Sequence, residues 1–132
     1  MAGRLVNVPG ASEVFKEGFV TYSNKAKRKH LDVNKNTLKK YGAVSRETAK
    51  EMAIGGALAT GSDLCVAITG LAGPDGGTEE KPVGLVYIAV AVKDNMKVQE
   101  YRFSGNRAKI RESAVVAALT QLRMSILENI QL

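Results

Sequence analysis

Apolar and polar positions follow two different periods in the second half of the chain, as is typical of layered α/β domains. Nearly continuous apolar runs at 63–70 and 83–92 predict two strands that are covered on both faces. Residues 96–103 alternate between apolar and polar side chains, which predicts a half-exposed strand after a tight turn at 94–95. Residues 106–130 repeat apolar side chains at steps of three or four, which predicts a long amphipathic helix.

The first half reads mainly as helices, with one additional strand. β-branched and aromatic residues at 18–23 predict that strand. Ser45 is expected to cap the longest of these helices at its N-terminus, and Gly61 is expected to end it. Helical patterns cover residues 2–8, 11–18, 24–31, 34–42 and 45–61. The order of elements predicts an α/β fold, a three-layer α/β/α sandwich around a mixed sheet, with residues 1–132 forming one domain.

Composition adds limits on location and redox chemistry. The 132 residues are 45% apolar and 24% charged, as in ordinary globular proteins. No apolar run approaches the roughly 20 residues that a membrane span requires, and the N-terminus lacks the apolar core of a signal peptide. We therefore expect a cytoplasmic protein with no membrane partner. The single cysteine, Cys65, lies in an apolar run and is expected to be a buried, unreactive thiol.

The positive charge is concentrated in the first half of the chain. Residues 1–50 contain eleven Lys or Arg against four Asp or Glu, whereas residues 51–132 contain eight against nine. A basic half is compatible with nucleic-acid binding, but no helix-turn-helix, zinc or RNA-binding signature accompanies it. A solvated helical face or a pocket for a small anion fits the pattern better, so nucleic acid is not the expected partner.

The stretch from Thr69 to Gly84 is a long glycine-rich connection between the two buried strands. It contains Gly70, Gly73, Gly76 and Gly77 but matches neither a Walker loop nor a dinucleotide fingerprint. Glycines allow backbone amides to approach a phosphate or an oxyanion closely, which favours a binding loop. A structural wide turn is the alternative.

Lys27 stands about one turn into the helix that follows Tyr22. A lysine held in an apolar crevice loses charge because its pKa falls, and the neutral amine can act as a general base. From spacing alone, the better reading is a solvated basic face shared with its lysine and arginine neighbours. No cluster in the sequence has metal-ligand spacing.

Arg107 and Arg111 lie four residues apart at the start of the last helix. Two guanidinium groups beside unpaired backbone amides suit a phosphate. Surface ion pairs with Glu100 and Glu112 are an equally good interpretation of the same spacing.

Four blocks of the sequence, in order, resemble the CinA C-terminal domain family, whose members include PncC-type nicotinamide mononucleotide amidohydrolases. The resemblance covers nearly the whole chain. It implies an α/β/α fold with a five-stranded mixed sheet, hydrolysis of the carboxamide of nicotinamide mononucleotide (NMN) to nicotinate mononucleotide and ammonia, and no cofactor or metal. The blocks are VPGASEVFKEGFVTYSNKAK, GAVSRETAKEMA, ITGLAGPDGGTEEKPVGLVYIAV and FSGNRAKIR.

The resemblance also implies roles for individual residues. A serine–lysine mechanism would place Lys27 and Tyr22 in the catalytic site, which reverses the reading of Lys27 from spacing. The glycine-rich loop would hold the substrate through Thr69, Gly70, Gly73, Gly76 and Gly77, with Arg107 and Arg111 as further binding residues. A homo-oligomer is also expected.

The chain departs from the family pattern at its start. Family members carry a strand and turn of the form A-E-S-C-T-G-G before the first helix, and its serine is the expected nucleophile. No such segment occurs in this sequence. We therefore expect an N-terminally truncated domain that lacks the first strand and hydrolyses NMN poorly. A non-catalytic nucleotide-binding or oligomerising module is the alternative.

Overall fold

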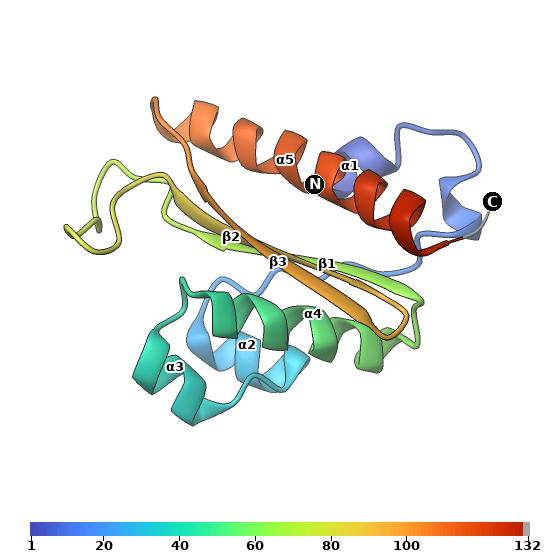
Figure 1. The fold of residues 1–132 in the computed structure, drawn as a ribbon, viewed down its shortest axis with the longest axis horizontal. Helices are drawn as coiled ribbons and strands as arrows, with labels where there is room; N and C mark the ends of the chain where they lie inside the picture. The colour runs from blue at the N-terminus through green and yellow to red at the C-terminus, as the bar shows by residue number, and fades with distance from the viewer. Residues whose placement is uncertain (131–132) are drawn as a thin grey trace.

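Three strands form an antiparallel sheet that carries helices on both faces (Figure 1). The computed structural model describes residues 1–130. The strands lie in the order β1 (Leu64–Gly70), β2 (Leu85–Val92) and β3 (Asn95–Arg102). One face is covered by α2 (Asn24–Leu31), α3 (Lys35–Tyr41) and α4 (Arg46–Thr60). The other face carries α5 (Arg107–Asn129) and the short α1 (Ala2–Leu5), with the 3₁₀ turn η1 (Ala11–Glu13) further along the N-terminal segment. The α/β class and its layers are thus confirmed.

The side chains of β2 alternate between two hydrophobic cores. Ala89 and Ala91 pack in the core under α4 and α2, where small residues leave room for the helices. Ile88 and Val90 belong to the core under α5, together with Ala114. Both cores exclude water from β2, so the prediction of a strand covered on both faces is confirmed.

A pair of glycines lets α4 approach its neighbours closely. A methyl group on Gly55 would stand 1.7 Å from the carbonyl oxygen of Leu31, at the end of α2. One on Gly56 would lie 2.6 Å from Sγ of Cys65 in β1. Cys65 is half-buried, and burial raises the pKa of its thiol, which favours the protonated, unreactive form.

Side-chain caps define where the helices begin. Each cap oxygen accepts a hydrogen bond from an amide in the first turn, at 2.8–3.1 Å. Gly61, with φ of 68°, ends α4 as predicted. The capping residues are Ser23, Asn34, Ser45 and Asn106.

The prediction of a strand at 18–23 is wrong. Residues 16–22 make no backbone–backbone hydrogen bond to any part of the chain that the structure describes. β-branched residues favour an extended backbone, but a strand also needs a partner for its amides and carbonyls. The expected mixed sheet is therefore not found within residues 1–130, where all strand pairs are antiparallel. Two boundaries also differ: the first helix ends at Leu5, and the β2–β3 turn uses residues 93–94.

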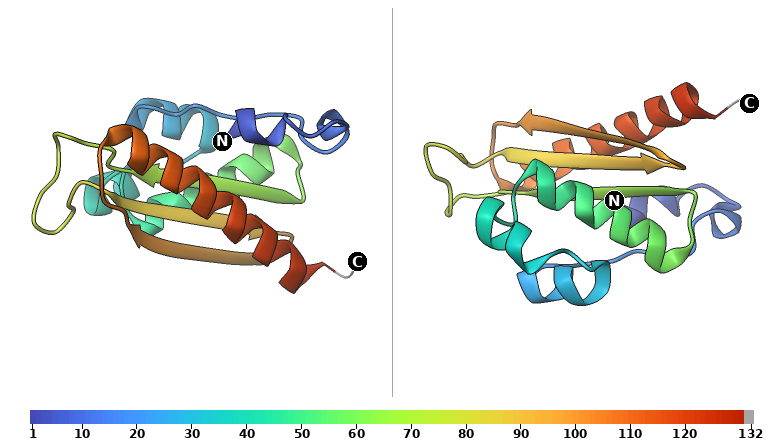
Figure 2. Two further views of the ribbon diagram at one scale, coloured as in Figure 1. Left: turned by 90° about the horizontal axis from the view of Figure 1, so that it is seen from above. Right: turned by 60° about the horizontal axis from the view of Figure 1, so that its bottom comes forward.

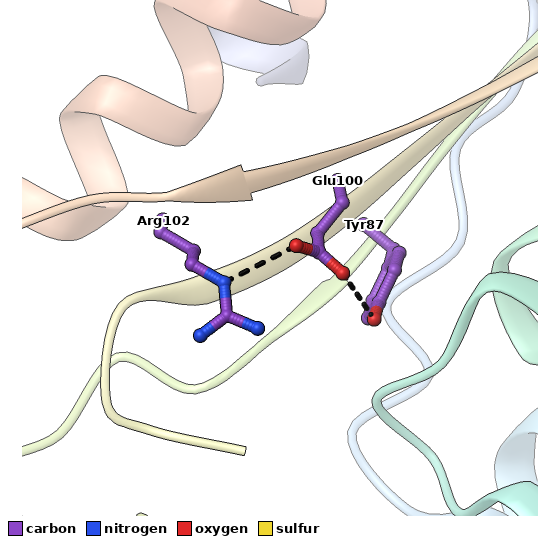
Figure 3. Close-up of polar contacts among 3 residues, drawn as sticks. All are labelled: Tyr87, Glu100 and Arg102. Carbon is purple, nitrogen blue, oxygen red and sulfur yellow. Dashed lines mark hydrogen bonds and ion pairs between the residues drawn. The ribbon is translucent and has the colours of Figure 1, made fainter. Parts of the chain in front are cut away.

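A polar ladder links β2 to the outer strand β3 (Figure 3). Tyr87 lies opposite Glu100, and its hydroxyl donates to the Glu100 carboxylate at 2.8 Å, while Arg102 donates to the same carboxylate at 3.2 Å. These two hydrogen bonds lower the pKa of Glu100. Arg46 of α4 donates to the carbonyl of Val98, which ties the helix to β3.

Among the described residues, no helix combines the length and apolar character needed to span a membrane.

Candidate functional site

Lys27 is a buried lysine without a counter-ion. Its side chain is 8% exposed, and its Nζ donates to the carbonyl oxygen of Thr21 at 2.7 Å. The ion pair within residues 1–130 joins Arg102 to Glu100, so no carboxylate there compensates the charge of Lys27. Desolvation consequently lowers the pKa of this amine. A solvated position, the reading from spacing alone, is wrong for Lys27.

Arg107 connects the N-terminal segment to the glycine-rich loop. Its Nη1 donates to the carbonyl oxygen of Gly73 at 2.9 Å, and its Nη2 donates to the hydroxyl of Tyr22 at 3.0 Å. Tyr22 immediately follows the residue that holds Lys27, yet its ring is 84% exposed. Three segments far apart in the sequence therefore meet around one arginine: the approach to α2, the β1–β2 loop and the start of α5.

The β1–β2 loop folds back on itself and has structure of its own. A side chain at Gly73, where φ is 76°, would stand 2.4 Å from Val83, and one at Gly77 would lie 2.7 Å from the Val83 amide nitrogen. Lys81 donates from Nζ to the carbonyl oxygen of Tyr41 and thereby anchors the loop to the end of α3. At Gly76 a methyl group would touch only Cδ2 of Leu71, at 4.0 Å, but φ there is 93°. Close packing therefore accounts for Gly73 and Gly77, whereas at Gly76 the left-handed backbone favours glycine.

Thr69 and Gly70 end β1 beside this loop. The hydroxyl of Thr69 donates to the carbonyl oxygen of Ala43 at 2.7 Å, so it holds the α3–α4 turn against the sheet. A side chain on Gly70 would meet Val86 at 2.7 Å. The sequence pattern did not suggest that Ala43 and Thr21 take part in the site. Both accept hydrogen bonds through main-chain carbonyl oxygens, which every residue has.

Arg111 lies apart from the Arg107 contacts. It lines a shallow depression of about 460 Å³ whose floor includes Met1 and Ile68. Glu100 contacts Tyr87 and Arg102, so the alternative in which it pairs with one of the two arginines at the start of α5 is wrong. Arg107 and Arg111 therefore differ in surroundings although they are one turn apart.

The arrangement supplies three chemical functions within a short stretch of surface. A buried amine with a lowered pKa can accept a proton, a guanidinium can hold an anion, and an exposed aromatic ring can contact a planar base. No group of three or more His, Cys, Asp or Glu side chains in the described part of the chain is placed to hold a metal.

Comparison with known proteins identifies the domain. The family model of the CinA C-terminal domain matches residues 1–126. The chain belongs to the CinA C-terminal domain family. A competence-damage inducible protein of Clostridium novyi (strain NT) is 55% identical over 129 residues, which cover 98% of this chain and 31% of that protein. The chain thus spans about a third of the length of the curated relatives that it matches.

Solved structures of CinA-type proteins share the fold. The competence/damage inducible protein CihA from Agrobacterium tumefaciens is 45% identical with a TM-score of 0.91, over 93% of this chain and 76% of that one. A CinA superfamily protein from Escherichia coli is 36% identical with a TM-score of 0.88, over 92% and 70% respectively. The resemblance inferred from sequence motifs is therefore confirmed for family and fold class.

Proposed function

We propose that this CinA-type domain belongs to an amidohydrolase that converts NMN to nicotinate mononucleotide and ammonia. The observation that carries the proposal is the buried amine of Lys27, which has no counter-ion. It donates to the carbonyl oxygen of Thr21, and the next residue, Tyr22, accepts a hydrogen bond from Arg107. Burial lowers the pKa of Lys27, so its amine loses its proton more readily and can serve as the base for a hydroxyl nucleophile. The fold alone would not support this reaction, because one fold hosts many activities.

The proposed reaction passes through an acyl-enzyme. Lys27 accepts the proton of a seryl hydroxyl as its oxygen attacks the carboxamide carbon, and the tetrahedral oxyanion is held by backbone amides of the β1–β2 loop. Collapse breaks the C–N bond as the Lys27 ammonium gives its proton to the departing amide nitrogen, which leaves as ammonia. Water then hydrolyses the ester to the carboxylate. Arg107 holds the 5′-phosphate, and the ring of Tyr22 contacts the substrate.

The seryl hydroxyl is proposed to come from an A-E-S-C-T-G-G segment seated along β1. Within residues 1–130, β1 pairs only with β2, so one row of its amides and carbonyls is available to another strand. Ser23 is poorly suited to the role, because its hydroxyl accepts a hydrogen bond from the Ala26 amide as the cap of α2. The 132-residue chain by itself is therefore expected to be nearly inactive.

Ammonia release from NMN tests the proposal. We would compare the chain as given with a chain extended by a segment bearing A-E-S-C-T-G-G, and test Lys27→Gln, Lys29→Gln and Ser→Ala variants of the extended chain. We expect restored turnover in the extended chain. Lys27→Gln should lower kcat by about 10²–10⁴, the usual contribution of a general base. Lys29→Gln, an exposed lysine on the same helix, is the matched control and should leave the rate unchanged.

The outcomes separate the proposal from its alternatives. Normal turnover by the chain alone would contradict the need for the added serine. No turnover by the extended chain, with NMN still bound in calorimetry, would support a non-catalytic nucleotide-binding module. That second function is favoured by one observation, the Arg107 contacts, which form without any nucleophile. Equal losses in both lysine variants would remove Lys27 from the mechanism.

A further inference from the structure

Helices α2 and α3 account for the whole net positive charge of the chain. Residues 24–41, which contain both helices, have seven Lys or Arg against one acidic residue, Asp32. The rest of the chain has twelve basic against twelve acidic residues and is therefore neutral. Both helices lie on the side of α4 away from the sheet (Figures 1 and 2). The positive charge is thus concentrated on one outer surface of the domain.

Six of these seven cations are exposed, and none of the six has an ion-pair partner within residues 1–130. Lys25 and Lys29 lie on the side of α2 opposite its buried side chains, since each helical residue advances by about 100°. On α3, Lys40 likewise lies opposite the buried Leu38. The basic surface is defined here by the six exposed cations: Lys25, Arg28, Lys29, Lys35, Lys39 and Lys40.

The basic surface is electrostatically unfavourable for the domain by itself. Lys25 and Lys29 are four residues apart on α2, and Lys35 and Lys39 are four apart on α3. Like charges at this spacing repel each other and destabilise a helix. A solvated protein surface ordinarily mixes both signs of charge. A bound polyanion would replace this repulsion with attraction.

The composition of the basic surface favours a nucleic-acid duplex among the possible polyanions. Within residues 24–41, Tyr41 is the one large hydrophobic side chain that is exposed, at 38%. Protein interfaces depend on apolar and aromatic anchors at their centre, and a helix that lies on a membrane needs an exposed apolar face. Single-stranded nucleic acid is held largely by stacking on aromatic rings. The backbone of a duplex, in contrast, requires only cations.

We propose that the basic surface binds the phosphate backbone of double-stranded nucleic acid without reading its base sequence. Five of its six residues are lysines, which contact phosphates as point charges and lack the fork of arginine that recognises guanine. The absence of a base-reading signature from the sequence agrees with this, because backbone contacts need none. The proposal is independent of the NMN reaction, because the surface lies on the outer sides of the helices whereas Lys27 is buried.

Fluorescence anisotropy with labelled duplexes provides the test. DNA and RNA duplexes of about 24 base pairs would be titrated with the chain from about 20 to 300 mM NaCl, to compare the two sources of this backbone. We expect a dissociation constant of about 10⁻⁶–10⁻⁴ M near physiological salt for at least one of them. The logarithm of the association constant should fall with the logarithm of salt concentration with a slope of about −3 to −5, as expected for four or five phosphate contacts.

Two double variants locate the contact. Lys25→Gln with Lys29→Gln should raise the dissociation constant about tenfold or more and reduce the salt slope by about two. Lys109→Gln with Arg123→Gln is the matched control, because it removes the same charge from exposed positions on α5, across the sheet. The control should bind as the native chain does. Circular dichroism checks that both variants keep their fold, which is expected because all four positions are exposed.

Three results would overturn the proposal. The first is no change in anisotropy with either duplex up to about 500 µM of the chain at the lowest salt. The second is an equal loss of affinity in both double variants, which would show that net charge alone is responsible. The third is displacement of the duplex by polyglutamate at the same concentration of charge, which would assign the basic surface to an acidic protein.

Discussion

The sheet core and the N-terminal segment represent opposite ways of holding a chain in place. β2 lies between two paired strands, and Ile88 and Ala89 in it are completely buried. The segment 16–22 has no backbone–backbone hydrogen bonds to the described chain, and Val20 within it is 89% exposed. The first is stabilised by burial along its whole length, whereas the second is held by a few side-chain contacts.

The candidate site lies where these two regions meet. Arg107 belongs to a long helix on the sheet, and it donates to Tyr22 in the weakly held segment. Lys27, in turn, holds Thr21 through one hydrogen bond. The position of Tyr22 therefore depends on contacts made by two polar side chains, those of Lys27 and Arg107. Regions of low local stability are common at binding sites, because such sites have to open and close.

The largest expected effect is loss of a side chain from the sheet core. Ile88→Ala should lower the free energy of unfolding by about 2–5 kcal/mol, because it removes buried apolar contacts and leaves a cavity. Val20→Ala, in the exposed segment, should change the free energy by less than about 0.5 kcal/mol. Urea unfolding followed by circular dichroism measures both. A comparable loss of unfolding free energy in both variants would show that segment 16–22 is packed as tightly as β2, and would contradict the difference between the two regions.

Removal of Arg107 should affect the N-terminal segment more than the core. Arg107→Ala deletes the hydrogen bond to Tyr22, worth about 1 kcal/mol after solvent competition, and this corresponds to about fivefold faster cleavage of the opened segment. Chymotrypsin cleavage after Phe19 or Tyr22 reports that opening. Arg111→Ala, one turn further along α5, has no hydrogen bond to this segment and should leave the cleavage rate unchanged. Equal acceleration by both variants would point to fraying of α5 instead.

The smallest expected effect is a pH dependence that comes from Lys27. Burial lowers the pKa of its amine in the folded protein below the ordinary value of 10.5. Between the lowered pKa and 10.5 the unfolded chain binds more protons than the folded one, so stability should rise with pH across that window. Lys27→Met removes the rise, and the exposed control Lys29→Met should keep it. Urea unfolding from neutral to alkaline pH measures the difference; parallel curves for the native chain and Lys27→Met would contradict a perturbed amine.

Local patterns in the sequence were sufficient for most of the elements. The caps Ser45 and Gly61 bound α4 as predicted, because capping depends on residues a few positions apart. Strand β2 was recognisable from its unbroken apolar run, since burial on both faces leaves no polar alternation. Local patterns could not decide whether residues 18–23 form a strand. The same residues form a strand when a neighbouring strand pairs with them and an extended segment when none does.

The candidate site required the tertiary structure. Lys27 stands in a run of lysines and arginines that look alike in the sequence, and only packing shows that this one is buried while Lys29 is exposed. Arg107 and Gly73 are 34 residues apart, and the donor and acceptor meet because α5 crosses the sheet beside the β1–β2 loop.

The sequence thus predicted most of the helices, the strands β1 and β2, the family and the residue types available for chemistry, although β1 is only partly buried. These follow from short-range periodicity, caps and motif spacing. The tertiary structure decided which lysine loses its solvent, which arginine reaches Tyr22 and which glycines are needed for packing. Those properties depend on contacts between distant segments, and local sequence does not encode the distances at which such segments come together.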